Sequence, residues 1–179
     1  MNGLVIGRFE PVHYGHVEFL KEVDKMQLEK IILGIGEEGI GRTPWNPFTY
    51  EEVKQMWLPE LGKLTTDVEL YKIPDINDGQ HYASHVEKIT GCNEKDTLIL
   101  SGNGATLDCF TNHGKNYKTH SVGYKIPTVD GYLCATKIRD MICKDKDWQR
   151  YVPESTKKVI EAVDGVNIIK NMGEKYERT

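Results

Sequence analysis

Residues 4–16 read LVIGRFEPVHYGH, and this stretch decides the fold. The apolar run at residues 4–6 predicts a strand, and the amphipathic periodicity of residues 17–24 predicts a helix directly after His16. A strand that passes into a helix in this way is typical of α/β proteins with a parallel sheet. Because the first turn of a helix has free backbone N–H groups and a partial positive charge, we expect a phosphate group to bind here.

Two histidines and a glycine stand at this junction. His13 and His16 can donate hydrogen bonds to phosphate oxygens, and the charge of an imidazole is tunable near neutral pH. Gly15 lets a ligand oxygen approach the backbone, and Arg8 adds a permanent planar cation that suits phosphate. Two other interpretations stay open. The histidines are ordinary surface or capping residues, or they share a zinc ion, for which the nearby sequence suggests no third ligand.

The composition predicts one globular domain over residues 1–179. Apolar residues make up 39% of the chain, enough for a real core. The net charge of −4 argues against a general nucleic-acid binder, and the chain contains no run of 18 apolar residues that would predict a membrane span. The four cysteines have no CxxC spacing, so we expect reduced thiols in a cytoplasmic protein.

Predicted strands and helices alternate through residue 122. Strand-like runs lie at residues 4–6, 30–35, 68–73, 97–100 and 117–122. Helix-like stretches lie at residues 17–24, 50–61, 81–89 and 105–112. Thr49 and Glu52 form a capping-box pattern at the start of the second helix. The alternation predicts an α/β fold, a doubly wound parallel sheet with helices on both faces.

A helical tail is predicted over residues 131–179. Residues 135–143 are expected to form one helix, and Pro153 opens another that runs to Val163 and stops at Gly165. The sheet needs no further strand, so we expect this tail to pack back on it.

Two motifs at opposite ends of the chain carry a family resemblance. The stretch from Gly7 to His16 resembles the first signature of the nucleotidylyltransferase superfamily. Residues 134–139, CATKIR, resemble its second signature, a Ser/Thr-rich turn that ends in Ile-Arg. Within this superfamily the chain is similar to the archaeal-type nicotinamide mononucleotide (NMN) adenylyltransferases. The supporting segments follow the family's order and lie at residues 46–49, 73–76, 101–103, 147–148, 152–155, 164–166 and 169–170.

The resemblance implies a Rossmann-like nucleotidylyltransferase fold whose helical tail carries the second signature. It implies that His13 and His16 face the ATP phosphates, and that Arg139 holds the β- and γ-phosphates and neutralises the departing pyrophosphate. Thr136 is expected to cap its helix and meet a phosphate oxygen, with Arg139 on the same helix face. The catalytic residues implied are Arg8, His13, His16 and Arg139. The ATP-binding residues implied are Gly7, Phe9, Gly15, Ser101, Gly102, Asn103, Thr136 and Ile138.

The acceptor side departs from the family pattern. The family usually has tryptophan at the Tyr82 position, an asparagine at the Gly79 position and often an arginine at the Trp45 position. It also commonly has glutamine where this chain has Glu10, a carboxylate that is unfavourable beside phosphates unless it is offset. The acceptor-binding residues implied are Arg42, Asn46, Asp75, Ile76, Asn77 and Tyr82. Three alternatives stay open: a core role for Tyr82, a plain turn at residues 101–104, and a solvated helix charge at Arg139.

Residues 34–39 match the pattern G-x-G-x-x-G and follow a predicted strand. A dinucleotide-binding fingerprint also needs a helix directly after the glycines, and residues 40–47 contain two prolines and cannot open one. We therefore interpret residues 34–47 as a flexible loop over the acceptor site and not as part of a dehydrogenase.

The resemblance implies a nucleotidyltransferase of NAD biosynthesis that joins ATP to NMN and releases NAD and pyrophosphate. ATP carries the Mg²⁺, and no protein-bound metal is implied. Two alternatives stay open. One is a related enzyme with another acceptor, namely nicotinate mononucleotide, flavin mononucleotide or phosphopantetheine, and the other is a catalytically silent nucleotide-binding module. The resemblance also implies a homo-oligomer.

Overall fold

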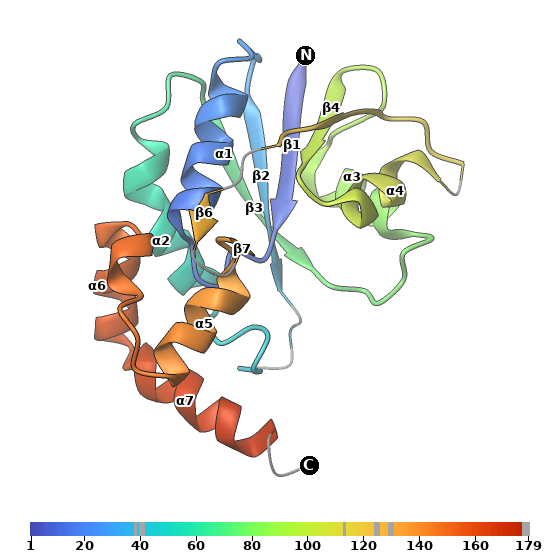
Figure 1. Ribbon diagram of the computed structural model, residues 1–179. Helices are drawn as coiled ribbons and strands as arrows, with labels where there is room; N and C mark the ends of the chain where they lie inside the picture. Colours follow the sequence, from blue (N-terminus) through green and yellow to red (C-terminus); the bar gives the residue numbers. More distant parts are fainter. Residues whose placement is uncertain (38, 40–41, 113, 124–125, 129–130, 177–179) are drawn as a thin grey trace. The chain divides into compact units, whose positions relative to one another are not determined.

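The computed structural model describes residues 1–37, 39, 42–112, 114–123, 126–128 and 131–176 (Figure 1). The chain forms two compact units, each assembled from three separate segments. The sheet unit comprises Met1–Arg8, Phe19–Gly39 and Leu64–Tyr124. The helical unit comprises Phe9–Glu18, Ile40–Lys63 and Lys125–Thr179. That residues 1–179 act as a single domain stays a prediction.

The sheet unit contains five parallel strands in the order β3-β2-β1-β4-β5 (Figure 1). The strands are β1 (Asn2–Gly7), β2 (Ile31–Glu37), β3 (Val68–Pro74), β4 (Thr97–Ser101) and β5 (Lys118–Ser121). Their positions agree with the five strand-like runs to within a few residues. The parallel sheet with its flanking helices confirms the predicted α/β class.

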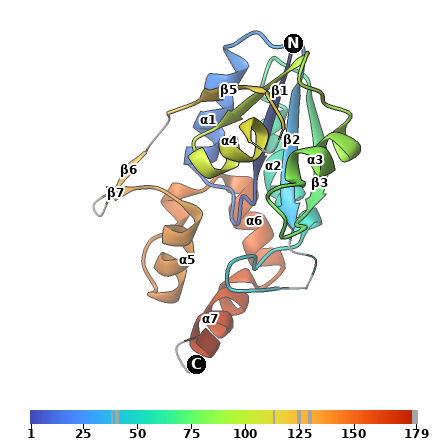
Figure 2. The same ribbon diagram turned by 90° about the vertical axis from the view of Figure 1, so that its right-hand side faces the viewer.

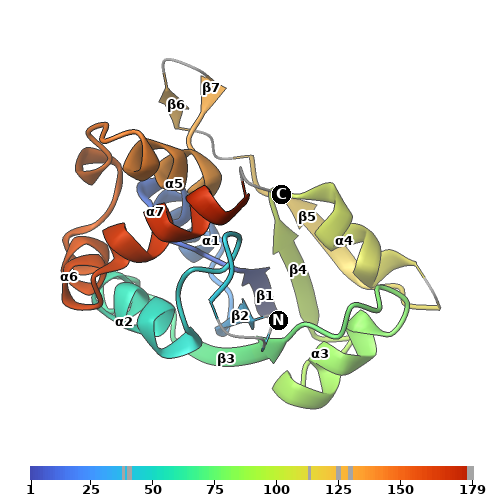
Figure 3. The ribbon, with the colours of Figure 1, turned by 90° about the horizontal axis from the view of Figure 1, so that it is seen from below.

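Apolar runs form the central strands because both faces of a parallel sheet are covered. Val5 of β1 lies opposite Leu33 of β2 and Leu100 of β4, and all three side chains are buried. On one face, the core also includes side chains from α3 (Tyr82–Thr90) and α4 (Gly104–Thr111), which pack against each other (Figure 3).

Helix α1 (Tyr14–Asp24) follows the β1 turn, and α2 (Tyr50–Leu61) follows the Asn46–Thr49 segment. The predicted capping box of α2 is confirmed: the Thr49 hydroxyl accepts from the Glu52 N–H, and the Glu52 carboxylate accepts from the Thr49 N–H. The capping box satisfies two backbone donors at the helix start and fixes where α2 begins.

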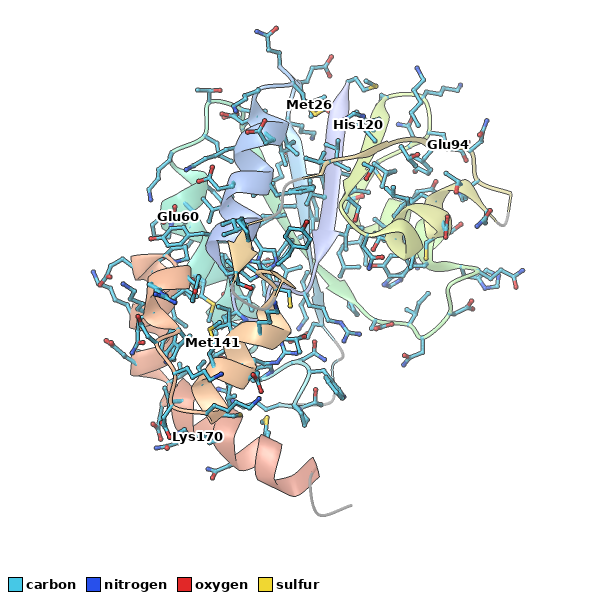
Figure 4. The ribbon with its side chains drawn as sticks, in the orientation of Figure 1. Met26, Glu60, Glu94, His120, Met141 and Lys170 are labelled. Atoms are coloured by element: carbon cyan, nitrogen blue, oxygen red, sulfur yellow. The ribbon has the colours of Figure 1, made fainter. Side chains whose placement is uncertain are left out.

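Three further helices complete the helical unit: α5 (Ala135–Cys143), α6 (Glu154–Ala162) and α7 (Gly165–Tyr176). Helix α6 contacts both α2 and α7, and α7 also contacts α5 (Figure 3). The Ser155 hydroxyl donates to the Met56 carbonyl at 2.7 Å, which joins α6 to α2. Lys170 of α7, labelled in Figure 4, forms a 2.5 Å ion pair with Asp145 after α5.

The structure corrects one predicted boundary and adds elements that the sequence did not predict. Helix α6 ends at Ala162, before Gly165, as predicted, but the sequence did not predict α7, which begins at Gly165. Residues 34–37 are the end of strand β2, not part of a loop, and residues 38 and 40–41 lie outside the described part of the chain. Three other elements had no sequence prediction: a 3₁₀ turn (Gln149–Tyr151) and the antiparallel strands β6 (Pro127–Thr128) and β7 (Gly131–Tyr132), of which β6 precedes the predicted tail (Figure 2).

None of the helices in the described part of the chain is both long and apolar enough to cross a membrane.

Candidate active site

The turn between β1 and α1 belongs to the helical unit and stacks two imidazoles. The rings of His13 and His16 lie 3.6 Å apart at an angle of 23°. Phe9, which enters the turn with φ of +57°, packs edge-on against His16 at 5.0 Å. A positive φ at a bulky residue is a strained conformation that packed surroundings must hold. This turn is therefore a rigid platform for the two rings.

A hydrogen bond at the start of α1 favours one tautomer of the His16 ring. The His13 carbonyl accepts from the N–H groups of His16 and Val17, which begins the helix. The His13 N–H in turn donates to Nδ1 of His16 at 3.4 Å. Because that contact uses the Nδ1 lone pair, it favours the tautomer with the proton on Nε2, a donor suited to a phosphate oxygen.

Burial makes both imidazoles neutral. Desolvation lowers the pKa of His13 to about 3, and the side chain is only 3% exposed. Desolvation, and then the neighbouring His13, lowers the pKa of His16 well below its ordinary value. The sequence predicted a charge that is tunable near neutral pH, and these lowered pKa values contradict it. Both nitrogens of His13 are buried without a hydrogen-bond partner among the residues that the structure describes.

Gly15 makes room for the His13 ring. A methyl group at this position would lie 2.8 Å from Cε1 and 2.9 Å from Nδ1 of His13, closer than side-chain carbons approach other atoms. The same methyl would lie 3.9 Å from the Leu133 carbonyl oxygen, immediately before α5. The N-terminal ends of α1 and α5 therefore adjoin, and both present backbone N–H groups and a partial positive charge.

Arg139 of α5 is hydrogen-bonded to the β1–α1 turn. Its Nη1 donates to the Glu10 carbonyl at 2.6 Å, and its Nη2 donates to the Thr136 hydroxyl at 3.2 Å. Arg139 and Thr136 thus share a helix face, as predicted. The predicted cap by Thr136 is wrong, because Cys134 occupies the N-cap position and makes no side-chain cap hydrogen bond. Ile138 is fully buried, so only its backbone could meet ATP.

The Glu10 carboxylate is buried and hydrogen-bonded within the helical unit. Its side chain is 3% exposed, and its Oε2 accepts from the Phe48 N–H at 2.9 Å. The carboxylate therefore joins the β1–α1 turn to the segment before α2, which includes the predicted acceptor residue Asn46. Asn46 is also buried, and its Nδ2 donates to the Thr43 hydroxyl at 3.3 Å.

Arg42, predicted on the acceptor side, is part of a clamp within the helical unit. Its guanidinium binds both Glu52 carboxylate oxygens, at 2.8 and 2.6 Å, and donates to the Pro47 carbonyl at 2.6 Å. A bidentate arginine–carboxylate pair combines charge with fixed geometry. Arg42 therefore holds residues 42–52 together.

The sheet unit brings four predicted residues together beyond the ends of β1 and β3. Arg8 pairs with Asp75 at 3.2 Å, and Asp75 also accepts from the Asn77 N–H at 2.9 Å. Burial, and then the Asp75 charge, raises the pKa of Tyr82 to about 12. The Tyr82 ring packs edge-on against Phe110 at 6.1 Å, so it also extends the core. Two more predicted residues lie next to these in the chain. Ile76 is half-buried and stands between Asp75 and Asn77, and Gly7 is the last residue of β1, directly before Arg8.

The turn after β4 has internal hydrogen bonds. The Ser101 hydroxyl accepts from the Asn103 N–H at 3.0 Å, and the Asn103 side chain caps α4 by accepting from the Ala105 N–H. A methyl group at Gly102 would make ordinary contact, 3.5 Å from the Val122 carbonyl. Contact of Ser101, Gly102 and Asn103 with nucleotide stays a prediction.

Trp57 of α2 is a supporting residue that sequence reasoning missed. It is fully buried, and its ring lies 5.2 Å from Phe9 and 6.4 Å from His16. The only sequence signal for it is the apolar periodicity of α2, which is equally typical of an ordinary core residue.

Comparisons with known proteins show which family the chain belongs to. A family model described as cytidylyltransferase-like matches residues 4–58. The chain is 34% identical over 175 residues to a nicotinamide-nucleotide adenylyltransferase of Methanococcus maripaludis. The match covers 98% of this chain and 97% of the Methanococcus protein. It is 33% identical over 181 residues to the protein of the same name from Thermococcus sibiricus. That match covers 99% of this chain and 92% of the Thermococcus protein.

Two solved structures share the fold. One is a bifunctional NMN adenylyltransferase/ADP ribose pyrophosphatase from Francisella tularensis complexed with AMP and a manganese ion, with a TM-score of 0.73 at 19% identity. The match covers 99% of this chain and 54% of that one, so this chain spans about half of its length. The other is the Plasmodium falciparum nicotinic acid mononucleotide adenylyltransferase complexed with NaAD, with a TM-score of 0.63 at 10% identity. This match covers 93% of this chain and 97% of the Plasmodium chain.

Proposed function

Because this chain belongs to the nicotinamide-nucleotide adenylyltransferase family, we propose that it transfers the adenylyl group of ATP to NMN, giving NAD and pyrophosphate. The observation that carries the proposal is the hydrogen bond from Arg139 to the Glu10 carbonyl, 2.6 Å long, between residues 129 positions apart. It supports one phosphate-binding site made from both signature motifs.

The proposed reaction is an in-line displacement at the α-phosphorus of ATP. An oxygen of the NMN phosphate forms the new P–O bond, and the bond from the α-phosphorus to the bridging oxygen breaks as pyrophosphate leaves. The attacking phosphate is already ionised, so the reaction needs no general base and no protein nucleophile. Positioning and charge stabilisation then supply the catalysis.

Each group at the site has a role that fits this reaction. Arg139 supplies the permanent charge that stabilises the departing pyrophosphate. The neutral His16 donates a hydrogen bond from Nε2, and the adjoining starts of α1 and α5 add backbone N–H donors. ATP enters with a bound divalent cation, for which we propose Mg²⁺.

The remaining assignments are part of the same proposal. Arg8 is proposed to be catalytic, as a further permanent cation for the phosphates. The residues proposed to contact the acceptor are Asp75, Ile76, Asn77 and Tyr82 of the sheet unit and Arg42 and Asn46 of the helical unit. Gly7, Phe9, Gly15 and residues 101–103 are proposed to contact ATP. We also propose a cytoplasmic homo-oligomer.

The proposal is tested by incubating the protein with ATP and Mg²⁺ and one acceptor at a time: NMN, nicotinate mononucleotide, flavin mononucleotide or phosphopantetheine. We expect NMN to give NAD and pyrophosphate in equal amounts and with the highest kcat/KM. A product with another acceptor alone would identify a related nucleotidylyltransferase instead. Binding of ATP with no pyrophosphate from any acceptor would contradict an enzymatic function.

A further inference from the structure

Trp45 differs from the other two tryptophans of the chain. Trp57 and Trp148 are 0% and 7% exposed, whereas Trp45 is 50% exposed. Single exposed apolar side chains are common on protein surfaces and by themselves indicate nothing. The place of Trp45 in the chain and the rigidity of its support are what distinguish it.

Trp45 stands at the tip of a tight turn. The Asn46 N–H donates to the Thr43 carbonyl at 3.1 Å, and the Thr43 N–H donates to the Asn46 carbonyl at 3.0 Å. Pro44 occupies the second position of this turn, where its fixed φ favours the bend. The turn therefore orients Trp45 with little conformational freedom in the backbone.

Both neighbouring segments fix this turn to the phosphate site. On one side, the Arg42 guanidinium binds the Pro47 carbonyl and the Glu52 carboxylate. On the other, the Phe48 N–H donates to the Glu10 carboxylate at 2.9 Å, and the Glu10 carbonyl accepts from Arg139. Three residues span at most about 10 Å, so Trp45 lies within roughly that distance of Phe48.

We infer that Trp45 contacts the aromatic ring of the acceptor and favours a positively charged pyridinium ring. The inference rests on the proposed function, because one ribose separates the ring of NMN from its reacting phosphate, which matches the short connection between Trp45 and the phosphate site. A rigidly held aromatic side chain binds a ring with little loss of freedom. Tryptophan is also the side chain that attracts a cation to its face most strongly.

The first experiment compares the wild type with Trp45→Phe and Trp45→Leu in steady-state kinetics. We expect Trp45→Leu to raise the KM for NMN about tenfold, while Trp45→Phe raises it less because it keeps a ring. The KM for ATP should change less than about twofold. Reduced NMN has an uncharged ring, so Trp45→Leu should raise the KM for reduced NMN less than it raises the KM for NMN. The matched control is Leu58→Ala, which removes an exposed apolar side chain from α2.

The second experiment titrates NMN into the wild type and Trp45→Phe and records tryptophan emission, which a pyridinium ring quenches on contact. We expect strong quenching in the wild type and little in Trp45→Phe, which keeps Trp57 and Trp148. Equal fractional quenching in both proteins, no quenching in the wild type, or an unchanged KM for NMN in Trp45→Leu would overturn the inference. If the wild type forms no NAD, the proposed function fails, and the titration, which needs no turnover, decides the role of Trp45 by itself.

Discussion

His13 shows how burial changes the chemistry of a residue that the sequence marks as functional. From the sequence, two histidines beside a phosphate site look like adjustable cations. The structure stacks them, and desolvation lowers the pKa of each, so that both rings are neutral. Permanent charge in the helical unit's site therefore comes from Arg139.

The lowered pKa of His13 predicts how stability depends on pH. The folded protein holds His13 at a pKa of about 3, against 6.5 for an ordinary histidine. Below pH 6.5 the unfolded chain binds a proton that the folded chain does not bind. The free energy of unfolding should therefore fall as the pH is lowered from 6.5 towards 3, by up to about 1.4 kcal/mol per pH unit for this group, and should not change on this account above pH 7.

This prediction is checked by urea unfolding of the wild type and His13→Gln between pH 7.5 and about pH 5, the part of the window in which the carboxylates stay ionised. The variant should lose less stability on acidification than the wild type. The control is His120→Gln, which makes the same substitution at an exposed position on β5, outside the β1–α1 turn (Figure 4). Parallel pH dependence of the His13→Gln and wild-type proteins would show that His13 is not held neutral.

His16→Ala and Arg139→Ala test the catalytic roles. Each removes a donor to developing phosphate charge, and loss of one such donor typically costs about 3 kcal/mol, or roughly 100- to 1,000-fold in rate. We expect losses of that order in kcat/KM for ATP, measured as pyrophosphate release from variants whose far-UV circular dichroism matches the wild type. Wild-type turnover by either folded variant would remove that residue from the mechanism.

At the scale of elements, Glu10 is the link between the β1–α1 turn and the segment that leads into α2. Glu10→Ala leaves the Phe48 N–H without its acceptor, which should cost about 1–3 kcal/mol of stability and raise the KM for NMN more than the KM for ATP. Glu10→Gln keeps a carbonyl that can accept the same hydrogen bond. It should therefore have close to the wild-type stability and the wild-type KM for NMN. Urea unfolding and steady-state kinetics of the two variants measure the effects, and equal defects in both would contradict this role.

Local patterns predicted most of the elements because local interactions form them. The capping box at Thr49 and Glu52 located the start of α2, and apolar runs located the five strands. Helix α7 was missed because a glycine after a helix usually ends it. Here Asp164 takes the left-handed conformation, with φ of +55°, and a methyl group on Gly165 would lie 3.0 Å from the Phe48 ring. That close approach is a tertiary contact, which a local pattern cannot show.

The same distinction applies to the candidate site. The family resemblance of the two signatures implied His13, His16 and Arg139 as site residues, and the structure brings the turn and Arg139 together. It did not predict that Gly15 accommodates the His13 ring or that Trp57 supports His16, because both depend on side chains that pack in three dimensions. Short strands such as β6 and β7, two residues each, carry no period that a sequence could reveal.

At the scale of the whole molecule, the proposed function depends on one site built from distant parts of the chain. The β1–α1 turn and the start of α5 both lie in the helical unit, where Arg139 reaches the Glu10 carbonyl. The most direct test is a crystal structure of the protein with Mg²⁺ and a non-hydrolysable ATP analogue. We expect the triphosphate to contact the His16 ring, the N–H groups at the starts of α1 and α5, and the Arg139 guanidinium. A triphosphate bound elsewhere, or one that contacts the β1–α1 turn but not Arg139, would contradict the account.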